Sequence, residues 1–88
     1  MYVILTYDVA DPGRLQKTLK YLRRYLNWIQ NSAFEGELSV AKLAAMKSGL
    51  EKLIDTTEDS VLIWTLRDVK WLERETMGVE KAPISTFI

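Results

Sequence analysis

The chain has 88 residues, of which 48% are hydrophobic, and its twelve basic residues balance twelve acidic ones. This length supports one small domain over residues 1–88, with dimerisation as the natural supplement to a limited core. Cysteine and histidine are absent, which excludes disulfides, thiolate and imidazole metal sites, histidine bases and cysteine nucleophiles. Carboxylates acting with hard cations remain as the main catalytic groups.

The zero net charge means that nucleic-acid binding must come from local clusters of basic residues. No apolar run approaches the roughly 20 residues that span a bilayer, and the opening segment lacks the features of a signal peptide. We therefore expect a soluble protein of the cytoplasm that has no membrane partner.

The opening segment, Tyr2–Val9, is apolar and rich in β-branched and aromatic residues, which predicts a central strand of a sheet. Asp8 places one carboxylate at the rim of that sheet. Asp11 and Pro12 then form a helix-start signal, so we predict a helix from Pro12 to about Tyr25. Its buried stripe consists of Leu15, Leu19, Leu22 and Leu26.

The second half of the chain predicts another helix and another strand. Residues 28–38 form either one bent strand or a tight hairpin of two short strands, and the pattern does not decide between them. Ser39 is the expected N-cap of a helix that ends before the polar run 55–59, and residues 60–66 alternate as a strand does.

This order predicts a ferredoxin-like α+β sandwich, βαββαβ, with two helices on one face of an antiparallel sheet. The segment 79–88 is apolar and needs a surface to cover it. We predict that it forms an extra C-terminal strand on a sheet edge, that of its own subunit or of a partner subunit.

Five segments together carry a family resemblance that covers nearly the whole chain. The most specific is the block from Gln30 to Leu38, which lies between the two predicted helices. On these segments the chain resembles the CRISPR-associated protein two family. The segments are Tyr2-Val3-Ile4-Leu5-Thr6-Tyr7-Asp8-Val9, Arg23-Arg24-Tyr25-Leu26, Gln30-Asn31-Ser32-Ala33-Phe34-Glu35-Gly36-Glu37-Leu38, Glu58-Asp59-Ser60-Val61 and Ile84-Ser85-Thr86-Phe87-Ile88.

The resemblance implies a two-fold homodimer in which the segment 79–88 adds to the partner's sheet. It also implies a scaffold that works with the CRISPR integrase and holds double-stranded prespacer DNA for insertion into the repeat array. The alternative is a metal-dependent endonuclease, acting on single-stranded RNA or on DNA, that uses Asp8. A third class, a dimer that binds a small metabolite, has no sequence motif in its favour.

Asp8 is the candidate catalytic residue and metal ligand. Two copies of Asp8 brought together by a two-fold axis would supply the one or two carboxylates that Mg²⁺ accepts, and Mn²⁺ would serve as well. The structural alternative is a strand-end acid that caps a turn or the following helix. Trp28 stands where some nuclease-active relatives carry an arginine, and this difference weighs against the nuclease.

Basic residues of the first helix are the candidates for nucleic-acid binding: Arg14, Lys17, Arg23 and Arg24. Arg14, Lys17 and Arg24 fall near one side of the helix, away from the leucine stripe, so they can form a ridge along a phosphate backbone. The alternative is an ordinary solvated helix face. Contacts of this kind predict binding without base readout.

Overall fold

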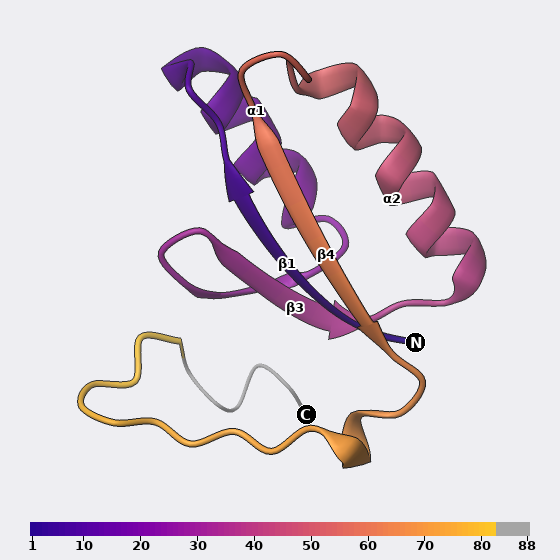
Figure 1. Cartoon of the computed structure of the whole chain (residues 1–88), viewed down its shortest axis with the longest axis vertical. Helices are drawn as coiled ribbons and strands as arrows, with labels where there is room; N and C mark the ends of the chain where they lie inside the picture. The colour runs from indigo at the N-terminus through magenta and orange to yellow at the C-terminus, as the bar shows by residue number, and fades with distance from the viewer. Residues whose placement is uncertain (83–88) are drawn as a thin grey trace.

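Four antiparallel strands form the sheet of this computed structural model, which describes residues 1–82 (Figure 1). Their order is β2-β3-β1-β4, so the opening strand lies inside the sheet as predicted. The ferredoxin-like α+β prediction is confirmed. The strands are β1 (Tyr2–Asp8), β2 (Asn27–Gln30), β3 (Ala33–Glu37) and β4 (Ser60–Leu66).

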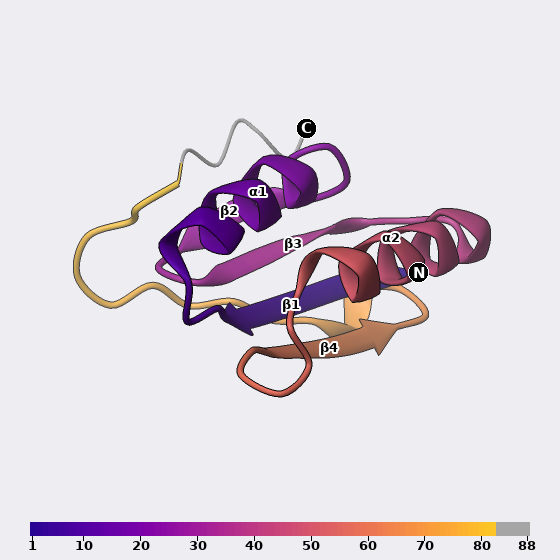
Figure 2. The ribbon, with the colours of Figure 1, turned by 90° about the horizontal axis from the view of Figure 1, so that it is seen from above.

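Two helices, α1 (Pro12–Leu22) and α2 (Val40–Leu53), lie on the same side of this sheet (Figure 2). Both begin at the predicted caps. The Asp11 carboxylate accepts a hydrogen bond from the Arg14 backbone N–H at 2.8 Å, and the Ser39 hydroxyl accepts one from the Lys42 N–H at 3.1 Å. The sequence signals for both helix starts were therefore correct.

The predicted end of the first helix, near Tyr25, was wrong. The helix stops at Leu22, and the chain then tightens into turns in which the N–H of Tyr25 bonds to the carbonyl of Leu22 at 3.0 Å. Leu26 is nevertheless buried, so the leucine stripe continues past the helix. A stripe of apolar residues reports burial and does not by itself mark where helical hydrogen bonding ends.

Residues 28–38 belong to a hairpin, which decides between the two alternatives that the sequence left open. β2 and β3 pair as antiparallel strands around the turn at Asn31 and Ser32. Asn31 adopts a φ of 44°, a left-handed conformation that asparagine tolerates better than most residues. The Trp28 indole N–H donates to the Asn31 carbonyl at 3.0 Å and closes the hairpin.

The core lies between the sheet and the two helices. Val3 and Leu5 of β1 and Phe34 of β3 have no exposed surface, and they pack against leucines of α1 and apolar residues of α2. Tyr7 packs on Phe34 with ring centroids 6.0 Å apart, so both aromatic residues contribute to the core. Among the described residues, no helix is long and apolar enough to cross a membrane.

Neither α1 nor α2 covers the opposite face of the sheet, here called the open face (Figure 2). Ile4 of β1 lies directly across from Trp64 of β4 and from Glu35 of β3, so these three side chains share that face. Leu62 and Trp64 are about half exposed, at 55% and 50%. The described part of the chain therefore leaves an apolar strip on β4 only partly covered.

The chain after β4 turns back toward β3 and β2 (Figure 1). It contains one 3₁₀ turn, η1 (Val69–Trp71), and no further strand as far as Ala82. Arg74 of this segment forms an ion pair with Glu35, whose side chain is almost completely buried. The predicted C-terminal strand falls largely on residues 83–88, which lie outside the described residues.

The Glu35–Arg74 pair predicts an asymmetric response to substitution. Arg74→Leu leaves the buried Glu35 carboxylate without its cation and should cost about 2 kcal/mol, less than a fully buried pair because Arg74 is partly exposed. Replacing both residues by leucine should recover much of that loss. Urea unfolding of the three proteins measures this, and a double variant less stable than Arg74→Leu would contradict it.

Candidate carboxylate site and nucleic-acid interface

Asp8 lies at the exposed end of β1, opposite Ser60 at the start of β4. Within residues 1–82, its carboxylate takes part in no hydrogen bond or ion pair. Asp11 caps the following helix instead, so Asp8 does not have that structural role. A carboxylate without a protein partner at a strand end is available to a cation or to a second protein chain.

A metal ion would find only part of a site in a single copy of the chain. No three acidic residues converge as metal ligands in the described part of the structure, and histidine and cysteine are absent from the sequence. Asp8 lies on the same face as Ile4, the open face, because alternate residues of a strand share a face. If two copies paired through the open face, the Asp8 carboxylates of both copies would lie on the side where the two sheets meet.

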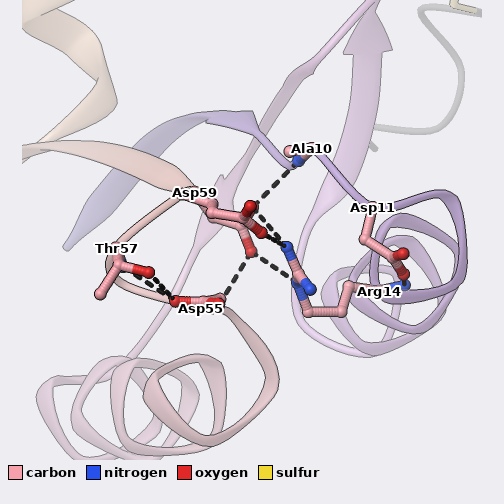
Figure 3. Close-up of polar contacts among 7 residues, drawn as sticks. Ala10, Asp11, Arg14, Asp55, Thr57 and Asp59 are labelled. Carbon is pink, nitrogen blue, oxygen red and sulfur yellow. Dashed lines mark hydrogen bonds and ion pairs between the residues drawn. The ribbon is translucent and has the colours of Figure 1, made fainter.

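Asp59 forms the densest polar cluster near this strand end (Figure 3). Its side chain has no exposed surface, and its carboxylate accepts hydrogen bonds from the backbone N–H groups of Ala10 at 2.9 Å and Asp55 at 2.8 Å. The Arg14 guanidinium completes the set, with its Nε 2.9 Å from Asp59. One carboxylate thus joins the loop after Asp8, the first turn of α1 and the loop before β4.

The electrostatics of the cluster follow from these contacts. Hydrogen bonds from Arg14 and from the Asp55 and Ala10 backbones hold the pKa of Asp59 well below its usual range. The same hydrogen bond raises the pKa of Arg14, with a further contribution from Glu58, 2.9 Å from its Nη2. Arg14 is therefore held by two carboxylates, and a phosphate would have to compete with them.

The other predicted basic residues are differently placed. Lys17, Arg23 and Arg24 are exposed, and none forms an ion pair with another residue in the range 1–82. Lys17 and Arg24 share a stripe of α1 and the turn after it with Lys20, at spacings of three and four residues. Arg23, the C-cap of α1, falls outside this stripe.

Charge is strongly segregated along the chain. Residues 12–34 contain five lysines and arginines and no acidic residue, so every acidic residue of the chain lies outside them. Four of these cations, Lys17, Lys20, Arg23 and Arg24, are exposed, whereas Arg14 is held by Asp59 and Glu58. The segment therefore has a local positive charge, although the net charge of the whole chain is zero. Nucleic-acid binding by a chain of zero net charge would require a local cluster of this kind.

Two carboxylates with large structural roles were missed from the sequence. Asp59 was placed in a polar run and in a resemblance segment without a role of its own, because its partner Arg14 is 45 residues away. Glu35 lay in the resemblance block without a role. Because neighbouring residues of a strand point to opposite faces, Glu35 lies on the face of the sheet opposite to that of Phe34. In neither case does a pattern of neighbouring residues predict which arginine pairs with the carboxylate.

Comparisons with known proteins support the family resemblance. The family model described as CRISPR associated protein Cas2 matches residues 1–74. The chain is 48% identical to a Pyrococcus furiosus protein named CRISPR-associated endoribonuclease Cas2, over the full length of both, and 51% identical to one of Archaeoglobus fulgidus, with 92% of this chain and 87% of that protein covered.

Solved structures give the same result. A structure titled "Crystal structure of cas2" aligns with a TM-score of 0.85 at 40% identity, covering 100% of this chain and 98% of the other. Cas2 of Streptococcus pyogenes aligns with a TM-score of 0.76 at 32% identity, over 89% of this chain and all of the other. The chain therefore belongs to the CRISPR-associated Cas2 family.

Proposed function

We propose that two copies of this chain form a scaffold that, together with the CRISPR integrase, holds double-stranded prespacer DNA for insertion into a repeat array. The observation that carries this proposal is the charge segregation on α1 and the turn that follows it. Lys17, Lys20 and Arg24 face solvent in a segment that contains no acidic residue. Such a stripe attracts a phosphate backbone and carries no device for reading bases.

The open face supports the homodimer. Leu62 and Trp64 are half exposed beside Ile4, and an apolar strip of this kind is a common feature of protein interfaces. Because α1 lies on the other side of the sheet, pairing through the open face leaves its cations accessible in both copies (Figure 2). The dimer would thus expose one cationic stripe on each copy.

Size-exclusion chromatography with light scattering tests the assembly. The chain is mixed with the integrase subunit and a short duplex, and we expect a complex containing two copies of this chain. Leu62→Lys/Trp64→Lys should leave the chain folded and monomeric, since both side chains point away from the core. A wild-type chain that remains monomeric and does not join the integrase would overturn the proposal.

A second candidate function is metal-dependent endonuclease activity at Asp8. It is favoured by the exposed carboxylate without a protein partner at the end of β1, and by the name endoribonuclease of the relatives. Mg²⁺ or Mn²⁺ would be held by the Asp8 residues of two copies, and a bound ion polarises a phosphoryl oxygen or activates water. Because the chain has no histidine to act as a base, a metal-bound water or a carboxylate would have to take that role.

This candidate predicts that substitution of Asp8 affects RNA cleavage and does not affect duplex binding. Asp8→Asn keeps the side-chain volume and removes the charge, so metal-dependent cleavage of single-stranded RNA should fall at least about 100-fold, the loss of a metal's electrostatic contribution. Duplex binding should be unchanged, because Asp8 lies on the open face. Cleavage that survives Asp8→Asn, or that needs no divalent ion, would exclude Asp8 as the metal ligand.

A further inference from the structure

A depression lies between the C-terminal half of α1 and the end of α2. Its volume is about 240 Å³, and its lining consists of Lys17, Lys20, Tyr21, Arg24 and Leu53. This is below the roughly 300–1,000 Å³ of sites for drug-sized ligands, so the depression suits one flat ring and not a larger molecule. It is a second site, remote from Asp8, which precedes the other end of α1.

The aromatic wall of the depression is fixed in place. The Tyr21 hydroxyl lies within hydrogen-bond distance of the carbonyls of Ala45, at 3.2 Å, and Met46, at 3.3 Å, both on α2. Gly49 makes this possible, since a Cβ there would lie 2.0 Å from the Tyr21 oxygen. Tyr25 supports the ring, with centroids 5.3 Å apart. A ligand would therefore meet a wall that is already ordered, which lowers the cost of binding.

The rim of the depression is purely cationic. Lys17, Lys20 and Arg24 are exposed, and within the described chain none of them pairs with a carboxylate. Arg24 lies 5.8 Å from the centre of the Tyr21 ring. Tyr21 and Leu53 supply apolar surface between these charges. The combination is complementary to a ligand that joins a planar ring to a negative charge.

We propose that this depression binds one unstacked nucleotide of a single-stranded nucleic acid, with the base against Tyr21 and Leu53 and its phosphates held by Lys17, Lys20 and Arg24. The inference rests on the proposed nucleic-acid binding and extends it to a strand that leaves a duplex. A paired base cannot reach such a wall, whereas a splayed base stacks on an aromatic side chain irrespective of its identity. An acidic peptide would pair with the cations of the rim, but it would place no planar ring against Tyr21 and Leu53.

The test compares two eight-nucleotide probes, oligothymidylate and a strand of the same length made of abasic sites, by fluorescence anisotropy. Both carry the same phosphates, and only the first carries bases. Wild type should bind oligothymidylate at least about 5-fold more tightly, as expected for one stacked base. Tyr21→Leu and Leu53→Ser, each checked for folding by circular dichroism, should remove that preference and leave the abasic strand unaffected.

Charge variants complete the design. Lys20→Gln should weaken the binding of both probes and lower the salt slope by about 0.7, whereas Lys47→Gln on α2, which is outside the depression, should change neither. Equal binding of the two probes by wild type, or no binding of either, would overturn the inference. The proposed scaffold is judged separately, by retention of an intact duplex together with the integrase.

Discussion

Replacing Lys17, Lys20 and Arg24 together by glutamine is expected to abolish duplex DNA binding at physiological salt. These cations face solvent without carboxylate partners in the described structure, so each can contact a phosphate. Each phosphate contact contributes about 0.9 to the magnitude of the slope of log K against log salt concentration. In the triple variant this slope should therefore be smaller by about 2.7 per chain. At physiological salt, affinity should therefore fall by at least about 100-fold.

The matched control removes three charges from the other helix. Lys42, Lys47 and Lys52 of α2 are also exposed, and their replacement by glutamine changes the net charge by the same amount. Filter binding or anisotropy at several salt concentrations measures both triple variants. If both lose affinity equally, the effect is one of net charge and the stripe on α1 is not the interface.

Asp59→Asn is expected to be the most destabilising polar substitution in the chain. The asparagine amide would face the N–H groups of Ala10 and Asp55 with at most one acceptor, and Arg14 would lose its charged partner. Because the Asp59 side chain is fully enclosed, water cannot replace these bonds without opening the cluster (Figure 3). The melting temperature should fall by roughly 10 °C.

Glu58→Gln provides the control for Asp59. Glu58 also bonds to Arg14, at 2.9 Å, but its side chain is more than half exposed. An exposed pair contributes little, so the melting temperature should change by no more than about 2 °C. If the two variants melt alike, the enclosure of Asp59 has no energetic importance and the cluster does not hold the loop after Asp8.

The pH dependence of stability follows from the lowered pKa of Asp59. The folded state takes up this proton less readily than the unfolded chain, whose aspartates titrate near about pH 3.9. The contribution of Asp59 is therefore complete above about pH 5 and is lost as the pH falls through the unfolded value towards the lower folded one. Between pH 5 and pH 3, wild type should lose stability more steeply than Asp59→Asn.

Local signals predicted most of the fold. The opening apolar run, the caps at Asp11 and Ser39 and the alternation of residues 60–66 each depend on neighbours a few residues away, and each was correct. The end of α1 was misplaced because Leu26 stays in the core although α1 ends at Leu22. The spacing of buried residues indicates a helix only as far as the helix itself extends.

The candidate site was less accessible from the sequence. Asp8 and the cations of α1 could be proposed because their spacing and chain position are local. The capture of Arg14 by Asp59 depends on a contact across 45 residues, which the fold alone creates. Likewise, the exposed apolar strip at Leu62 and Trp64 became visible only once the helices were placed on the opposite face of the sheet.

Spacer integration tests the proposed function most directly. The reaction contains the CRISPR integrase, a plasmid with a repeat array and short duplex DNA, and it compares wild type with Asp8→Asn and with the Lys17, Lys20 and Arg24 triple variant. We predict that integration requires this protein, continues with Asp8→Asn and fails with the triple variant. Integration that proceeds equally well without this protein would contradict the scaffold and leave the Asp8 nuclease as the remaining candidate.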